Sequence, residues 1–101
     1  MEMNESNFDE ILNESNVPVL VDFWSMCCAP CKLLSTIIDD VSKEVEDKAK
    51  IFKVNIDTNP ELATRFDITN LPTVIIFNGN TITSTIVGLK KKEDYIKALN
   101  I

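Results

Sequence analysis

A pair of closely spaced cysteines directly after an apolar run is the feature that most restricts what this chain can fold into. Residues 19–23 are apolar except for Asp22, as expected of a strand that is covered on both faces. The run Cys28-Ala29-Pro30-Cys31 follows shortly after. A C-x-x-C pair in a turn between a strand and a helix is typical of a redox site in an intracellular chain. The same spacing also serves as half of a zinc site, so spacing by itself leaves both interpretations open.

Length and charge restrict the class of protein. The chain has 101 residues, which fits a single domain over residues 1–101, and 45% of them are hydrophobic, enough to bury one core. The formal net charge is −6, whereas nucleic-acid binding requires a basic surface, so we expect no nucleic-acid partner. An acidic surface also disfavours anionic membranes, and no apolar run is long enough to predict a transmembrane helix. Residues 1–5 are polar and acidic, unlike a signal peptide, so we expect a cytoplasmic protein.

The cysteine and histidine counts restrict the chemistry. Three cysteines are too few for a disulfide scaffold, and in a reducing compartment they are more often reactive than structural. The chain has no histidine, which removes Cys–His nucleophilic catalysis and histidine-ligated metals. A closed zinc site needs about four ligands. Cys27, Cys28 and Cys31 could therefore complete a metal or iron–sulfur site only when two chains share it.

Hydrophobic periodicity and turn residues predict alternating helices and strands. Ser6 opens the first helix, with Asp9 in a capping-box-like pair, and Asn78-Gly79 predicts a tight hairpin. In the longest helix, the residues at helical spacing that predict its buried face are Leu33, Leu34, Ile37, Ile38, Val41 and Val45. The expected elements are helices at about 6–16, 28–47, 61–66 and 91–100, and strands at 19–23, 49–56, 74–77 and 81–87. A right-handed crossover makes the first two of these strands parallel, and the hairpin adds an antiparallel edge.

Several motifs in the same order resemble one known family. Asp22-Phe23-Trp24 followed by residues 28–32 closely resembles the thioredoxins, whose usual run is D-F-W-A-x-W-C-G-P-C-K. Residues 53–57 resemble the family's third strand and its exit, and Leu71-Pro72-Thr73 resembles its cis-proline segment. Gly88 stands where the family has a glycine beside the active site. The resemblance runs from about residue 8 to residue 99, nearly the whole chain.

This resemblance implies a fold, and the sequence departs from the family at three places. The implied class is α/β with the thioredoxin fold, a central mixed β-sheet flanked by helices. Only residues 1–4 precede the first helix, so we expect the N-terminal strand of the family to be short or missing. Cys27 replaces the usual tryptophan, and Ala29 replaces the usual glycine.

Cys28 is the candidate nucleophile and Cys31 the candidate resolving thiol. A free thiol has a pKa of about 8.5, and the reactive form is the thiolate. If Cys28 caps the helix, its sulfur can accept a hydrogen bond from the amide of Cys31, and the helix N-terminus lowers the pKa of the thiol. Pro30 then falls in the first turn, where its missing N–H is tolerated. Cys31 lies further into the helix, so we expect it to be more enclosed. The alternative is a pair of buried structural cysteines.

The resemblance also assigns roles to residues outside the cysteine pair. Burial in an apolar strand should raise the pKa of Asp22. The matching aspartate of the family exchanges a proton with the resolving thiol, helped by a lysine that matches Lys53. The alternative is an aspartate that only hydrogen-bonds nearby backbone. Pro72 is predicted to be cis and to expose the backbone of Leu71 to an extended substrate, the alternative being an ordinary trans proline. Trp24 is expected to shield the site and to contact Asp57 or its neighbours, or else to be a core aromatic.

The predicted function is that of a thiol–disulfide oxidoreductase, a protein-disulfide reductase that cycles between the Cys28/Cys31 dithiol and disulfide. The residues expected to bind substrate are Trp24, Ala29, Pro30, Leu71, Pro72 and Gly88. The implied partners are disulfide-containing target proteins and a thioredoxin reductase, and we expect a monomer without cofactor or metal. Two alternatives stay open: a metal or iron–sulfur module that uses Cys27, Cys28 and Cys31 across a dimer, and an adaptor of the same fold without redox turnover. The resemblance does not explain Cys27. Three interpretations stay open: a substitution without a function of its own, a regulatory thiol, or a metal ligand.

Overall fold

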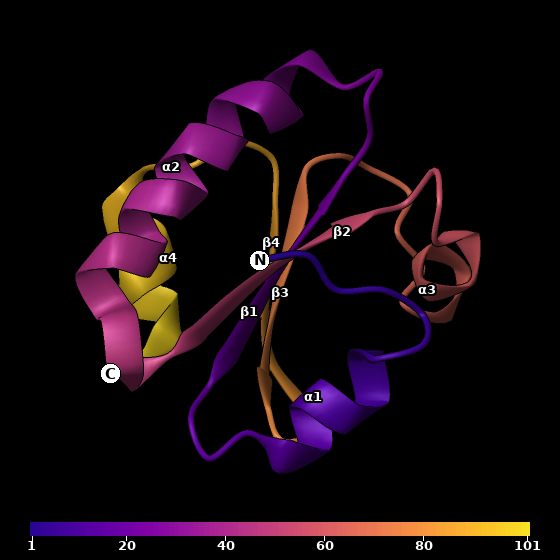
Figure 1. The fold of residues 1–101 in the computed structure, drawn as a ribbon. Helices are drawn as coiled ribbons and strands as arrows, with labels where there is room; N and C mark the ends of the chain where they lie inside the picture. The colour runs from indigo at the N-terminus through magenta and orange to yellow at the C-terminus, as the bar shows by residue number, and fades with distance from the viewer.

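The computed structural model describes residues 1–101, and its elements follow the predicted order (Figure 1). The elements are α1 (Phe8–Glu14), β1 (Val19–Trp24), α2 (Ala29–Val45), a short 3₁₀ helix (Glu46–Lys48), β2 (Lys50–Asn55), α3 (Pro60–Arg65), β3 (Thr73–Asn78), β4 (Thr81–Val87) and α4 (Lys92–Leu99). No helix combines the length and the apolar character that crossing a membrane requires.

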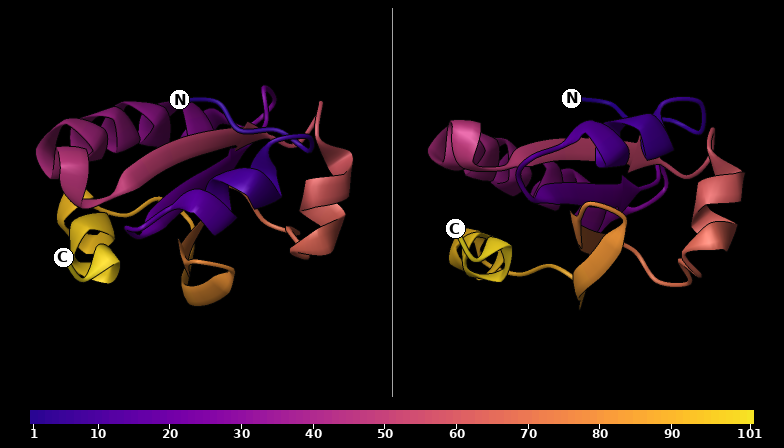
Figure 2. Two further views of the ribbon diagram at one scale, coloured as in Figure 1. Left: turned by 60° about the horizontal axis from the view of Figure 1, so that its bottom comes forward. Right: turned by 90° about the horizontal axis from the view of Figure 1, so that it is seen from below.

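Four strands form one mixed sheet in the order β2-β1-β3-β4. β1 and β2 are parallel, with α2 as their crossover, whereas β3 is antiparallel to both β1 and β4. Helices α2 and α4 cover one face of the sheet, and α1 and α3 lie on the other side (Figure 1 and Figure 2). The predicted α/β class with a mixed, helix-flanked sheet is confirmed. Because β1 is hydrogen-bonded along both edges, the end of this strand is a rigid base for the loop that follows.

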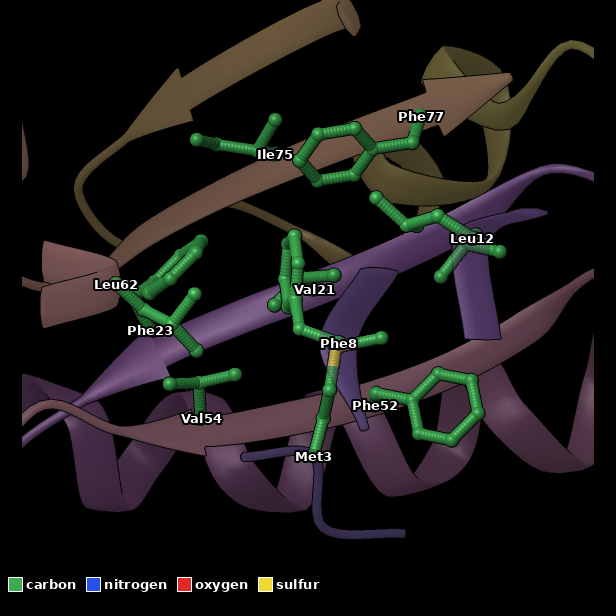
Figure 3. Packing of buried hydrophobic residues seen from close by; sticks show 11 residues of the cluster. Met3, Phe8, Leu12, Val21, Phe23, Phe52, Val54, Leu62, Ile75 and Phe77 are labelled. Atoms are coloured by element: carbon green, nitrogen blue, oxygen red, sulfur yellow. The ribbon is translucent and has the colours of Figure 1, made fainter. Parts of the chain in front are cut away.

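The side chains of β1 alternate between two hydrophobic clusters, as the period of a strand requires. Val21 and Phe23 pack with Phe8 of α1 in the cluster between the sheet and α1 and α3 (Figure 3). Leu20 packs on the opposite face, beneath α2 and α4. Each large apolar side chain that is fully buried in this way contributes about 1.5–3 kcal/mol. Asp22 has the same parity as Leu20, so its carboxyl belongs to the face that α2 and α4 cover.

The N-terminal strand is reduced to one bridge, as expected from the few residues before α1. Glu2 pairs in parallel with Lys53 of β2. The Lys53 amide donates to the Met1 carbonyl at 2.8 Å, and the Met3 amide donates to the Lys53 carbonyl at 2.9 Å. The Met3 side chain is buried in the same cluster as Phe8, which anchors the segment. The segment therefore covers the outer edge of β2 at one position, next to Lys53.

The start of the first helix differs from the prediction. Helix α1 begins at Phe8 with Asn7 as N-cap, and no side chain caps it, so the expected pair between Ser6 and Asp9 does not form. The carboxylate of Asp9 instead accepts two hydrogen bonds from the Arg65 guanidinium of α3, at 2.8 and 3.0 Å. Spacing along the chain could not reveal this partner, because Arg65 is brought to Asp9 by tertiary packing.

Two further expectations were wrong in detail. Helical spacing predicts that Leu33 lies on the buried face of α2, but its side chain is 62% exposed. Leu34 and Ile38 point into the core, and Leu33 lies next to them on a face that no other element covers. The hairpin turn lies one residue later than Asn78-Gly79: β3 includes Asn78, and Asn78 pairs with Thr81. Gly79 has a positive φ of 61°, which residues with a side chain rarely adopt, and this places the turn at Gly79.

Candidate active site

Cys28 lies at the junction of β1 and α2 and is the N-cap of α2. Its Sγ accepts a hydrogen bond from the backbone amide of Cys31 at 3.2 Å, as the sequence predicted. The two residues form a disulfide, with their Cα atoms 5.3 Å apart. Pro30 lies in the first turn of the helix, where a backbone N–H would have no intrahelical acceptor, so its missing donor breaks no helical hydrogen bond. In the reduced state, the same amide and the helix dipole would stabilise a thiolate on Cys28.

The two cysteines differ in access to solvent. Cys28 is half-buried, whereas Cys31 is only 2% exposed. An incoming disulfide can therefore reach the sulfur of Cys28, while the sulfur of Cys31 is enclosed by the helix and the sheet. This difference agrees with the expectation that Cys31 is the more enclosed of the pair.

Asp22 is a buried carboxyl without a hydrogen-bond partner. The residue is 1% exposed, and neither carboxyl oxygen is hydrogen-bonded. Burial raises the pKa of Asp22 from 3.8 to about 7, because the charged form loses its hydration. The positive charge of Lys53 opposes this rise in pKa, and the carboxylates of Glu2 and Asp39 add to it. The carboxyl therefore makes none of the backbone hydrogen bonds that the alternative interpretation of Asp22 expected.

Lys53 lies beside Asp22 but is not bonded to it. The two residues are partners in the parallel register of β1 and β2. The Lys53 ammonium donates to the Ser35 hydroxyl at 2.7 Å and forms an ion pair with Asp39 at 2.8 Å, both on α2. A cavity of about 310 Å³ separates this cluster from the loop before α2 and is lined by Trp24, Cys31, Ser35 and Lys53 among others. Sequence reasoning selected Lys53 but missed Ser35 and Asp39.

The segment around Pro72 is held by a chain of hydrogen bonds that begins at α4. The Leu71–Pro72 peptide bond is cis, as predicted. The Pro72 carbonyl accepts a hydrogen bond from the Gly88 amide at 2.9 Å. The hydroxyl of Tyr95, a buried residue of α4, donates to the Gly88 carbonyl at 3.3 Å and accepts from the Lys90 amide at 3.1 Å. The backbone N–H and C=O of Leu71 make no hydrogen bond within the protein.

The Asp57 carboxylate is bound by the two residues after Trp24, whereas Trp24 contacts a neighbour of Asp57, as expected. The Ser25 hydroxyl donates to the Asp57 carboxylate at 2.9 and 3.1 Å, and the Met26 amide donates to it at 3.2 Å. The Trp24 backbone carbonyl accepts a hydrogen bond at 2.9 Å from the amide of Ile56, the residue before Asp57, and the indole N–H has no hydrogen-bond partner. The sequence does not indicate this role for Ser25, apart from its position shortly before the cysteines. Its partner, Asp57, lies in the loop after β2, far away in the sequence.

The rim of the site is apolar and carries a free thiol. Met26 is 69% exposed, and Ala29 and Pro30 are also exposed. Cys27 is exposed and unpaired. No group of three or more cysteine, aspartate or glutamate side chains is arranged to hold a metal ion. The metal or iron–sulfur alternative therefore gains no support from the geometry of these side chains.

Comparison with known proteins agrees with this geometry. The family model described as Thioredoxin matches residues 1–100. A thioredoxin of Rickettsia bellii is 41% identical over 98 residues, which cover 97% of this chain and 93% of that protein. Thioredoxin 1 of a Nostoc species is 37% identical over 91 residues, covering 90% of this chain and 85% of that protein. The chloroplastic M-type thioredoxin of Spinacia oleracea is 40% identical over 91 residues, covering 90% of this chain and 50% of that protein.

Proposed function

The chain belongs to the thioredoxin family, and we propose that Cys28 is the attacking and Cys31 the resolving residue of its disulfide cycle. The protein is a thiol–disulfide oxidoreductase that reduces protein disulfides through this pair. The observation that carries the assignment of roles is the hydrogen bond from the Cys31 amide to the Cys28 sulfur at the start of α2. This bond favours a thiolate on Cys28, and the half-buried position of Cys28 lets a target reach it.

The cycle transfers two electrons to the target. The Cys28 thiolate attacks one sulfur of the target disulfide, so that a mixed disulfide forms and the other target sulfur leaves as a thiolate. Cys31, once deprotonated, attacks the Cys28 sulfur, which forms the Cys28–Cys31 disulfide and releases the second target sulfur. The target disulfide is reduced, and the cysteine pair is oxidised. The oxidised pair must then be reduced again by a partner.

Asp22 is the group we assign to the proton of Cys31. A thiol attacks only as thiolate, so the resolving step needs a base for the Cys31 proton. With a pKa of about 7, the Asp22 carboxyl can both accept and release a proton near neutral pH. Lys53, its register partner, lines the same cavity as Cys31 and modulates the charge at this position.

A target segment would bind in an extended form beside the cysteines. The unpaired backbone N–H and C=O of Leu71 are free to form strand-like hydrogen bonds with it. Gly88 supports Pro72 from behind through its amide. The exposed Ala29 and Pro30, with Trp24 beneath the loop, supply the apolar contact.

The family as a whole acts on disulfide-containing proteins and depends on a reductase, and this chain requires both kinds of partner. For this chain we propose a monomer that works as one domain over residues 1–101. We place it in the cytoplasm, because net reduction of target disulfides needs a reducing compartment.

Insulin reduction with a dithiol donor tests the cysteine assignment. Cys28→Ser should abolish turnover, because a hydroxyl with a high pKa does not replace the thiolate. Cys27→Ser is the matched control, since it changes the neighbouring free thiol in the same way and should retain near-normal turnover. Retained activity in Cys28→Ser would remove Cys28 from the attacking role.

A further inference from the structure

A cluster of charged and polar side chains faces Asp22 from the neighbouring elements. Lys53 of β2 is its register partner. Asp39 lies on α2, and Glu2 lies on the N-terminal segment that pairs with Lys53. Tyr95 of α4 is close enough for its phenol to be affected by the charge of Asp22. In this cluster Lys53 forms its ion pair with Asp39, and the Asp22 carboxyl has no hydrogen-bond partner.

The arrangement on α2 explains where the Lys53 ammonium points. Ser35 and Asp39 are four residues apart, so both side chains lie on the same side of the helix. The hydroxyl accepts from Lys53 Nζ at 2.7 Å, and the carboxylate accepts at 2.8 Å. The Lys53 side chain is only 16% exposed, so its surroundings restrict the path it can take, whereas the Asp39 side chain is 62% exposed.

We propose that Ser35 and Asp39 are positioning residues, which hold the Lys53 ammonium against α2 and so keep it from forming an ion pair with the Asp22 carboxyl. Asp22 can then take up and release a proton near neutral pH, and its carboxylate form is the base that accepts the Cys31 proton. The consequence for catalysis rests on the proposed role of Asp22, but the positioning itself does not.

The physical reason is the size of an ion pair's effect on a buried acid. A cation within a few Å of a carboxylate lowers the pKa of that acid by about 1–3 units. Direct contact with Lys53 would therefore shift Asp22 toward the ionised form at neutral pH and make it a weaker base for the Cys31 proton. Asp39 acts twice, because it binds the ammonium and also adds a negative charge that disfavours ionisation of Asp22. Lys53 also lines the cavity beside Cys31, so its head group has open space on that side if the bonds to α2 are removed.

The test is the titration of the Asp22 carboxyl followed by carbon NMR, with Ser35→Ala and Asp39→Asn in the otherwise unchanged protein. Each variant should titrate at a pH lower by about one unit than the wild type, since Lys53 becomes free to approach. Asp40→Asn is the matched control: Asp40 is the exposed neighbour of Asp39 and makes no bond to Lys53. It should titrate like the wild type. Ser35→Thr keeps the hydroxyl and should restore the wild-type titration.

Repeating the titration in a protein that lacks the Lys53 ammonium distinguishes positioning of Lys53 from a general disturbance of α2. In Lys53→Met, Ser35→Ala should no longer change the titration of Asp22, because the group it positions is absent. A shift that persists in this background, or the absence of a shift in Ser35→Ala itself, would overturn the proposal. If the NMR titration shifts as expected while the pH dependence of insulin reduction does not, the positioning stands and the catalytic role of Asp22 fails.

Discussion

The buried carboxyl of Asp22 predicts a stability that falls as the pH rises. In the unfolded chain this group ionises near its ordinary pKa of 3.8, whereas in the folded protein burial raises the pKa to about 7. Below the lower pKa both states carry the proton, and Asp22 has no effect on stability. Between the two values the unfolded state loses the proton while the folded state keeps it, so unfolding becomes progressively easier. Above the higher value the full destabilisation is present.

The size of this effect follows from the shift in pKa. The rise from 3.8 to about 7 is roughly 3 units, and at about 1.4 kcal/mol per unit it amounts to about 4 kcal/mol. Small domains have unfolding free energies of about 5–15 kcal/mol, so this single group is a large part of the total. Asp22→Asn keeps the shape and removes the ionisation. We expect the variant to be more stable than the wild type by about 4 kcal/mol near pH 8.

Urea unfolding of the oxidised protein near pH 4 and near pH 8 measures this prediction. The difference in unfolding free energy between Asp22→Asn and the wild type should be small near pH 4 and grow with pH. Asp40→Asn is the control, because Asp40 is exposed and shows what loss of one negative charge does by itself. A difference between Asp22→Asn and wild type that is the same at both pH values would refute the reasoning, since it would mean that Asp22 titrates alike in both states.

Three further predictions concern single side chains. Cys31→Ser should still attack but not resolve, so non-reducing gels should show a stable mixed disulfide between Cys28 and target proteins; the absence of any trapped species would reverse the order of the two cysteines. Cys27→Ala should keep near-normal insulin reduction, and the oxidised wild type should slowly form dimers that this variant does not form; a loss as large as that of Cys28→Ser would place Cys27 in the chemistry. Gly88→Ala should lower the urea midpoint by the equivalent of about 1–2 kcal/mol, because Gly88 has a φ of 92° although a Cβ there would meet no atom; an unchanged midpoint would show that the loop relaxes.

The elements and the cysteine geometry could be predicted because they depend on local chemistry. The apolar run of β1 has to be buried on both faces, and the residues after it form a helix start. The N-cap role of Cys28 and its bond from the Cys31 amide follow from the position of the cysteine at that start. The cis state of the Leu71–Pro72 bond is different, because it was predicted from the resemblance to the family and not from any local preference.

The parts that were missed depend on partners far apart in the sequence. Ser25 is separated from Asp57 by 32 positions, and Lys53 is separated from Ser35 by 18. The sequence predicts a local capping role for Asp9, but its carboxylate is bound by the guanidinium of Arg65, 56 positions away. Polar side chains choose among several available partners, and the choice is made by packing. Periodicity restricts which face a residue occupies but does not identify its partner.

The two ionisable centres of the site are controlled by opposite means. At Cys28 the anion is favoured by the start of α2, because the sulfur accepts a hydrogen bond from the Cys31 amide there, and the chain has no histidine to pair with the thiolate. At Asp22 the anion is disfavoured by burial, and the one cation in reach is bound elsewhere. The attacking thiolate is thus stabilised by the start of α2, while the carboxyl that serves the resolving thiol can take up or release a proton near neutral pH. α2 contributes to both conditions, since its first turn stabilises the thiolate and the side chains further along it bind Lys53.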